Sequence, residues 1–374
     1  MDNKKSFWHR IAGSKLVPIL LSVILAFGVG AVFLAVMGLD VGVSYGRLLT
    51  SVTGIKGFSY VVVYSIPYIM TGLSVAFSFK TGIFNIGAEG QFVVGSMAAA
   101  VLGILFGDLP KAVLIPLCFV AAMLAGFLWG LMVAFLKTKR GINEVLSMIM
   151  FNWIAFYLSN FIAGIPAIHS EGTAEATRNI SENATTLLPK DFIKSAGLCS
   201  TANWGILVAV VFTVAVWFVI EKTTLGYCLK AVGFNRFSAD YAGIDVDRSV
   251  LTAIGTSGAI AGLGGALQLM GMGGRISVFT AQEGYGFAGI VVALMGGSNP
   301  FGVFLAGLFY AALIYGGSKL NLVGVPTQLV NVIVGTVVYF IAISVVFPRL
   351  RKLKKRPSAR RAGATENEEE GPAI

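Results

Sequence analysis

Residues 81–91, Thr-Gly-Ile-Phe-Asn-Ile-Gly-Ala-Glu-Gly-Gln, place three polar side chains between two long apolar runs. These side chains are those of Asn85, Glu89 and Gln91. A carboxylate near the centre of a bilayer costs about 2.5–3.5 kcal/mol on insertion scales. Amides and carboxylates can form hydrogen bonds with the hydroxyl groups and ring edges of a polar solute. The segment therefore predicts a polar site that contacts or gates a solute inside an otherwise apolar chain.

Other polar residues lie within or near apolar runs. Glu144 and Asn152 are eight positions apart, just over two helical turns, so they share a helix face. Glu283 precedes a glycine-rich apolar segment, and Gln268, Gln328 and Asn331 lie in later runs. For Glu89 and Glu144, solute contact and the locking of helices remain open alternatives, because either arrangement satisfies the carboxylate.

Aromatic side chains near these polar residues could stack on a flat ring of a solute. For each of them, packing against lipid or another helix is the more common role. The candidates for stacking are Phe84, Phe92 and Trp153.

The elements that must position these residues are membrane helices. The chain has 374 residues, of which 56% are hydrophobic and 12% charged, whereas soluble domains carry about 25% charged residues. Apolar runs of about 20 residues are long enough to cross a bilayer. We therefore predict an all-α polytopic membrane protein with about ten spans, at 16–37, 58–79, 91–107, 111–136, 144–164, 203–221, 250–272, 284–298, 300–318 and 326–347.

The distribution of basic residues predicts the orientation. With the N-terminus inside, 20 of the 28 lysines and arginines fall in inner segments, so the positive-inside rule places both termini in the cytoplasm. The predicted parts are an N-terminal segment (1–15), a transmembrane domain (16–347) with an outer loop at 165–202 and an inner loop at 222–249, and a basic then acidic tail (348–374), which we predict to be disordered. The charge of +10 thus indicates topology rather than nucleic-acid binding.

Ten spans divide into two sets of five that would enter the membrane from opposite sides, so any repeat is inverted. Sequence support for a repeat is weak, because the similarity of 82–107 to 284–308 is only an alternation of glycine and small apolar residues. Glycines at 255, 258, 262 and 265 predict a smooth helix face. The 284–298 span is short and expected to be interrupted. Since Lys80 is predicted at the inner surface, residues 81–90 are expected at the inner entrance of the third span, as a gate or re-entrant corner.

The inner loop 222–249 contains a short helix pattern. Asn235 is a plausible N-cap and Gly243 a plausible C-terminal residue. Phe237, Tyr241 and Ile244 fall at i, i+4 and i+7, which gives one apolar edge. Such a helix is suited either to docking on a cytoplasmic partner or to lying on the membrane surface.

Catalytic motifs are not found in the sequence. It lacks the Gly-x-x-x-x-Gly-Lys-[Ser/Thr] loop that holds nucleotide phosphates. The two histidines, His9 and His169, do not lie where a membrane triad or zinc site would form. We therefore expect no catalytic residues, no metal, no cofactor bound by this chain and no enzymatic activity of its own.

Three segments together resemble the permease subunits of ATP-binding cassette importers. They are Gly82–Gln91, Asn143–Asn152, and the stretch from Gly226 through Ile244 followed by Glu283–Gly297. The resemblance covers about residues 16–347 and is closest to the branched-chain amino acid and ribose permease superfamily, within it to nucleoside-type permeases. It implies a type II importer-like fold. It also implies a coupling helix over 233–245, with Gly233, Asn235, Arg236, Asp240, Tyr241, Gly243 and Ile244 at the interface with an ATPase.

The resemblance also implies a place and partners for this chain. The place is the bacterial cytoplasmic membrane. The partners are a second permease, a two-cassette ATPase that uses the ATP, an extracytoplasmic solute-binding lipoprotein and membrane lipids, and the implied solute is a nucleoside. Simple-sugar and riboflavin permeases are similar and remain alternatives. An ion-driven secondary transporter is a rival, which the clustering of carboxylates at span ends weakly disfavours; a channel or a membrane enzyme is less favoured.

Overall fold

The computed structural model describes residues 16–354 except 171, 173 and 174, so the predicted N-terminal segment and most of the tail lie outside the described residues. The chain forms two compact units, 42–324 and the two ends of the chain together. In the smaller unit, α2 (Leu16–Val36) packs against α15 (Thr327–Lys354). Both helices match predicted spans.

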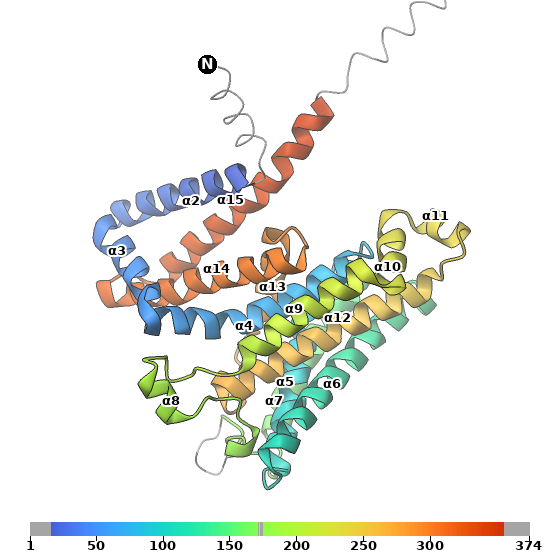
Figure 1. Ribbon diagram of the computed structural model, residues 1–374, viewed down its shortest axis with the longest axis horizontal. Helices are drawn as coiled ribbons and strands as arrows, with labels where there is room; N and C mark the ends of the chain where they lie inside the picture. The colour runs from blue at the N-terminus through green and yellow to red at the C-terminus, as the bar shows by residue number, and fades with distance from the viewer. Residues whose placement is uncertain (1–15, 171, 173–174, 355–374) are drawn as a thin grey trace, which may run out of the picture. The chain divides into compact units, whose positions relative to one another are not determined.

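The larger unit contains the remaining helices (Figure 1). Its described residues include seven helices that are long and apolar enough to cross a membrane by themselves, counting α12 with the π-helical turn Leu269–Gly273 that continues it, and α14 with its 3-10 turn Lys319–Val323. An eighth apolar helix, α13, has 11 residues and is too short to cross alone. The helices are α3 (Val41–Val52), α4 (Gly54–Phe79), α5 (Ala88–Leu105), α6 (Lys111–Arg140), α7 (Glu144–Ala163), α8 (Lys190–Ser195), α9 (Gly205–Lys222), α10 (Thr224–Phe234), α11 (Arg236–Tyr241), α12 (Val246–Gln268), α13 (Tyr285–Met295) and α14 (Pro300–Ser318).

Close packing at glycine explains why α12 lies at the centre of this unit. A Cβ at Gly258 would meet the carbonyl of Gly126 on α6, and a Cβ at Gly265 would meet the carbonyl of Phe92 on α5. Gly262 lies equally close to the backbone of α6 at Ala122. The predicted glycine face is therefore confirmed. Without side chains at these positions, three helix backbones approach one another closely, as is typical of membrane helices.

Two helices of the larger unit begin part-way along their neighbours. After α4 the chain turns at Gly82, whose φ is 72°, and returns to start α5 at Ala88. The short helix α13 starts where Tyr285 packs on Tyr68 of α4, with ring centroids 5.5 Å apart. Tyr68 lies eleven residues, about 16 Å, from the Phe79 end of α4. The N-termini of α5 and α13 meet there, because a Cβ at Gly286 would clash with the backbone of Glu89.

The two helices that begin part-way along their neighbours, α5 and α13, pack reciprocally. α5 packs along α12, whereas α13 packs along α4. α4 and α12 are the two most buried of the candidate spans. Each of these central helices is therefore followed in sequence by a helix that packs on the other central helix.

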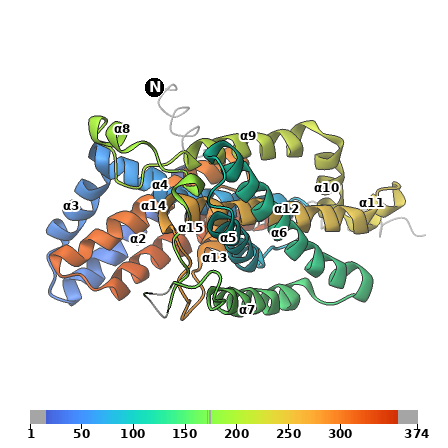
Figure 2. The same cartoon turned by 90° about the horizontal axis from the view of Figure 1, so that it is seen from below.

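The two long connections of the larger unit lie at its opposite ends. The described residues of 165–204, which include α8, form a folded cap at one end, and α10 and α11 form a hairpin at the other (Figures 1 and 2). The cap is held by isolated bridges, Ala176 to Ser277 and Leu187 to Asn203. The segments predicted as the outer loop (165–202) and the inner loop (222–249) therefore belong to opposite ends of the larger unit.

Candidate functional site

Glu89 lies at the point where α5 and α13 meet. Its carboxylate accepts hydrogen bonds from the backbone N–H groups of Gly284 (2.7 Å) and Gly286 (2.6 Å). The side chain is 1% exposed. The first N–H groups of a helix have no partner within the helix, and a carboxylate there also interacts favourably with the helix dipole. Glu89 therefore fastens the N-terminus of α13 to α5.

A second buried set of hydrogen bonds links α4, α5 and α12. The amide of Asn85 donates to Oε1 of Gln91 (2.8 Å) and to the hydroxyl of Ser257 on α12 (2.6 Å). The Ser257 hydroxyl in turn lies 2.9 Å from that of Ser74 on α4 and 2.7 Å from its carbonyl oxygen. Asn85 is fully buried and Gln91 is 1% exposed, so both side chains fix helices in this structure.

Asn152 holds the same turn from the side of α7. Its Oδ1 accepts from the N–H of Gly90 (2.8 Å), and its amide donates to the carbonyl of Ile86 (3.1 Å). Together, Asn85, Glu89, Gln91 and Asn152 form a buried polar junction around the start of α5. We keep the name polar junction for these four residues.

The polar junction lies deeper than we expected from the sequence. Residues 81–90 were predicted at the inner entrance of a span, at the level of Lys80. Instead, the chain reverses at Gly82. Glu89 accepts from the N–H of Gly286, and the neighbouring Tyr285 packs on Tyr68, which lies about half-way along α4. Glu89 therefore lies at the level of Tyr68. The expected re-entrant corner agrees with this reversal, but the expected level at the inner entrance was too shallow for Glu89, because one sequence does not show how deep such a corner reaches.

Glu144 does not join the polar junction. It lies two helical turns from Asn152, at the start of α7, and its carboxylate pairs with the ammonium of Lys137 at 2.5 Å. Both residues line a cavity of about 410 Å³ together with Arg236 of α11. Glu144 therefore belongs to the end of the unit that carries the α10–α11 hairpin.

The three aromatic candidates for stacking do not share one surface. Phe84 packs edge-on against Phe79, with ring centroids 5.1 Å apart. Phe92 is fully buried and packs on Tyr285. Trp153 is 44% exposed and lies against Phe156 and Tyr157 along α7. Their predicted role as a common base-stacking set gains no geometric support.

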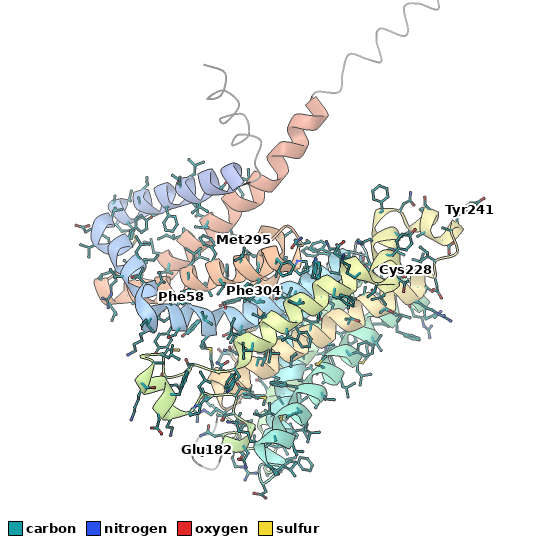
Figure 3. All side chains as sticks on the ribbon, viewed as in Figure 1. Phe58, Glu182, Cys228, Tyr241, Met295 and Phe304 are labelled. Carbon is teal, nitrogen blue, oxygen red and sulfur yellow. The ribbon has the colours of Figure 1, made fainter. Side chains whose placement is uncertain are left out.

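The α10–α11 hairpin agrees with the helix pattern in the sequence. Asn235 caps α11 by accepting from the N–H of Ser238 (3.1 Å), and Gly243 follows it with φ 81°. Phe237 is 88% and Tyr241 97% exposed, and Tyr241 projects from the tip of the hairpin in Figure 3. Ile244 is half-buried and lines an adjoining cavity.

The hairpin touches the re-entrant turn before α5. Gly233 of α10 lies so close to the carbonyl of Lys80 that a Cβ there would clash with it. Burial lowers the pKa of the Lys80 ammonium, and the nearby Glu221 carboxylate opposes this effect. A displacement of α10 would therefore also displace the backbone of residues 80–82, three residues before Asn85.

The sequence did not single out two members of this network, Ser74 and Ser257. Both are ordinary small residues on apolar helices, and only their contact across 183 positions gives them a role. Among the described residues, no three His, Cys, Asp or Glu side chains gather in a way that could hold a metal ion.

A family match covers most of the chain. Residues 57–342 match the family described as branched-chain amino acid transport system / permease component. The chain belongs to this permease family. The members of such a family are transport components with several membrane helices, in agreement with the apolar helices of this permease.

Three relatives show how far the similarity extends. A guanosine ABC transporter permease of Bacillus subtilis (strain 168) is 38% identical over 91% of this permease and 97% of the relative. A nucleoside ABC transporter permease of Lactococcus lactis subsp. cremoris is 31% identical over 93% and 97%. A glucose ABC transporter permease of Haloferax volcanii is 35% identical over 89% and 88%. No solved structure matches this permease.

Proposed function

We propose that this permease is the membrane subunit of an ATP-binding cassette importer that moves nucleosides across the bacterial cytoplasmic membrane. The observation that carries the proposal is full-length similarity to two relatives named for guanosine and nucleosides, at 38% and 31% identity. The polar junction fits a transporter, because buried polar groups at membrane depth are expensive and mark functional elements.

We infer ten crossings with both termini inside, built as an inverted five-helix repeat. The reciprocal packing supports this inference: α5 lies on α12 and α13 on α4. In each half, a long buried helix precedes a helix that begins part-way along its neighbours, and these two helices, α5 and α13, meet N-terminus to N-terminus at Gly286 and Glu89. Interrupted helices at a repeat interface are a common feature of transporters.

Energy is proposed to come from a separate two-cassette ATPase that docks on the α10–α11 hairpin. Phe234, Phe237 and Tyr241 are between 88% and 97% exposed there, and exposed aromatic side chains are typical anchors of protein interfaces. ATP binding and hydrolysis in the partner would displace α10. Because Gly233 touches Lys80, this displacement would reach the re-entrant turn and then the polar junction. A second permease and an extracytoplasmic binding lipoprotein would complete the importer.

A simple sugar is the second candidate solute. The glucose permease of Haloferax volcanii is 35% identical, and a fructose import permease of Rhizobium meliloti is 28% identical over 58% of this chain. A sugar and a nucleoside both offer hydroxyl groups. They differ in the base, so competition between them distinguishes the two proposals.

We expect cells that express the complete transporter to accumulate labelled guanosine, and we expect a hundredfold excess of unlabelled nucleoside to abolish this uptake. Equal excesses of glucose or fructose should leave it unchanged. Cells that lack this permease but express the other subunits should show no uptake. If glucose or fructose competes and nucleosides do not, the assignment to nucleosides is wrong although the permease class stands.

Replacing Phe237 and Tyr241 with alanine together should lower uptake and solute-stimulated ATP hydrolysis at least tenfold. Truncating two interface anchors commonly costs about 2 kcal/mol or more in binding, whereas the two side chains contribute little to folding because they are exposed. The matched control is Phe58→Ala, an exposed phenylalanine at the opposite end of the unit (59% exposed). Wild-type ATP hydrolysis and normal co-purification of the ATPase with the double variant would contradict the docking role.

A further inference from the structure

Residues 274–284 form an extended segment that joins the outer end of α12 to the start of α13. The segment begins in the cap, where the carbonyl of Gly274 accepts from the N–H of Ile180 (2.8 Å). Further along, both backbone groups of Phe279 pair with the side-chain amide of Asn160 on α7 (2.8 and 2.9 Å). It ends at Gly284, whose N–H donates to Glu89.

These hydrogen bonds show how far residues 274–284 extend along the membrane helices. Gly90, next to Glu89, bonds to Asn152, and Asn152 lies eight residues, about 12 Å, nearer the start of α7 than Asn160. The segment therefore descends from the outer cap to the level of the polar junction. This level is about half-way along the membrane helices α4 and α7.

The side chains of this segment are exposed and polar. Arg275, Ser277, Thr280 and Glu283 are all exposed in this chain. An irregular backbone at membrane depth is tolerated only where protein buries it or where it lines a water-filled cavity. Exposed polar side chains on such a backbone cannot face lipid tails. The contrast with Asn85, Glu89 and Gln91, which are at most 1% exposed at the same level, indicates which polar groups a solute can reach.

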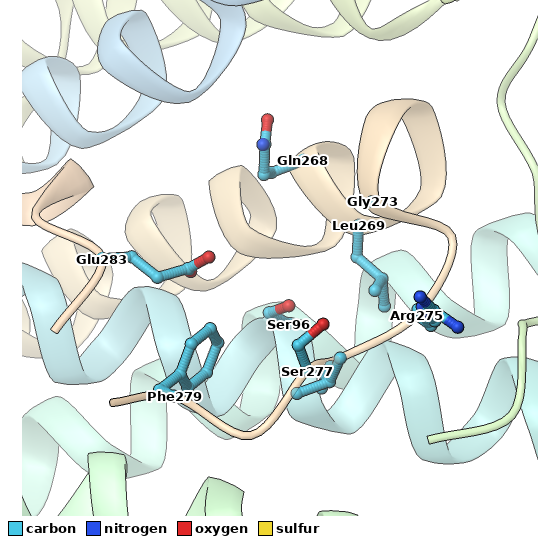
Figure 4. Close-up of a pocket in the computed structure, with 9 residues that line it drawn as sticks. Ser96, Gln268, Leu269, Gly273, Arg275, Ser277, Phe279 and Glu283 are labelled. Atoms are coloured by element: carbon cyan, nitrogen blue, oxygen red, sulfur yellow. The ribbon is translucent and has the colours of Figure 1, made fainter. Parts of the chain in front are cut away.

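A cavity of about 230 Å³ opens beside the segment. Figure 4 shows the carboxylate of Glu283 projecting toward Ser96 and Ser277, with Phe279 nearby and Arg275 at the other end of the lining. Gln268 also lines the cavity, and its Oε1 is buried without a hydrogen-bond partner among the described residues. A carboxylate, two hydroxyls, a spare amide oxygen and a ring are suited to a neutral solute with hydroxyl groups and a flat face.

We propose that this cavity, lined by Glu283, Ser277, Ser96, Gln268 and Phe279, is the contact site of the solute in this chain. Glu283 accepts hydrogen bonds from ribose hydroxyl groups, while the polar junction only holds the helices. The proposal rests on the proposed function for the identity of the solute.

The variant Glu283→Gln should raise the KM for nucleoside uptake about tenfold, because it replaces one of the two acceptor oxygens for the hydroxyl groups of the solute with an NH2 group. The side chain is exposed, so the melting temperature of the purified transporter should not change. The control is Glu182→Gln, an exposed carboxylate in the cap, which should leave KM unchanged. An unchanged KM for Glu283→Gln would overturn the assignment of Glu283.

Single cysteines test whether the segment lines water. A membrane-impermeant, charged thiol reagent added outside intact cells should label Ser277→Cys and Glu283→Cys. It should not label Val120→Cys, which is 54% exposed on the apolar surface of α6 at a similar depth, about 14 Å from the start of that helix at Lys111. Native Cys118 and Cys199 are fully buried, and the wild-type chain gives the background.

Solute protection then separates the site from the identity of the solute. We expect guanosine to slow the labelling of both engineered cysteines at least fivefold. Protection by glucose but not by guanosine would keep the site and reject the nucleoside assignment. Labelling that neither solute slows would overturn solute contact, and no labelling at all would overturn the aqueous path.

Discussion

Replacing Glu89 with alanine is expected to abolish transport and to lower the melting temperature of the purified transporter by about 5–10 °C. The variant leaves the N–H groups of Gly284 and Gly286 buried without their acceptor. Each unpaired buried donor costs about 1–3 kcal/mol. The start of α13 would then lose its attachment to α5. Uptake assays and thermal unfolding of the purified complex measure the two effects.

A graded series strengthens this test. Glu89→Gln keeps one acceptor oxygen but turns an NH2 group toward the second N–H, so its effect should be intermediate. The control Glu182→Ala removes an exposed carboxylate from the cap and should leave both readouts unchanged. Normal uptake and normal melting of Glu89→Ala would show that the carboxylate does not hold the two helices together.

Replacing Gly286 with alanine is expected to lower uptake at least tenfold and to reduce the yield of folded transporter. The added methyl group would overlap the backbone of Ala88 and Glu89, and overpacking of this kind costs about 1–3 kcal/mol or more. Alanine stabilises a helix by about 1 kcal/mol relative to glycine. A loss of stability would therefore have to come from the overlap of the added methyl group with α5. Uptake and size-exclusion profiles measure the outcome.

The matched control is Gly46→Ala on α3, where a Cβ would meet no atom within 4 Å. Helix propensity alone should leave this variant as stable as the wild type, or slightly more stable. If Gly286→Ala behaves like Gly46→Ala, the N-termini of α5 and α13 do not meet as closely as the structure has them.

Local sequence patterns, namely apolar run length and helix capping residues, predict a large part of the fold. Apolar run length finds a helix at each of the ten predicted spans, for example 250–272 against α12 and its π-helical continuation to Gly273, but it does not find α3 or α8. Capping chemistry predicts the start of α11 at Asn235 and its end before Gly243. These features depend on neighbours in the chain, so one sequence is enough to find them.

The candidate site depends on contacts that no local pattern shows. Asn85, Glu89, Gln91 and Asn152 were found because polar residues in apolar runs are rare, but their partners Ser257 and Gly286 lie far away in the sequence. The depth of Glu89 could not be predicted, because a re-entrant corner after Lys80 can be short or reach far into the membrane with the same local sequence. Glu144 was grouped with Asn152 by helical spacing, although its ion pair with Lys137 places it at the hairpin end.

The most direct test of the account is nucleoside accumulation in proteoliposomes that contain this permease with its partner subunits and binding protein. The account predicts that labelled guanosine accumulates only when the ATPase is supplied with ATP, and that ionophores that dissipate proton and sodium gradients do not change the rate. Accumulation driven by an ion gradient without ATP would contradict the account and favour a secondary transporter.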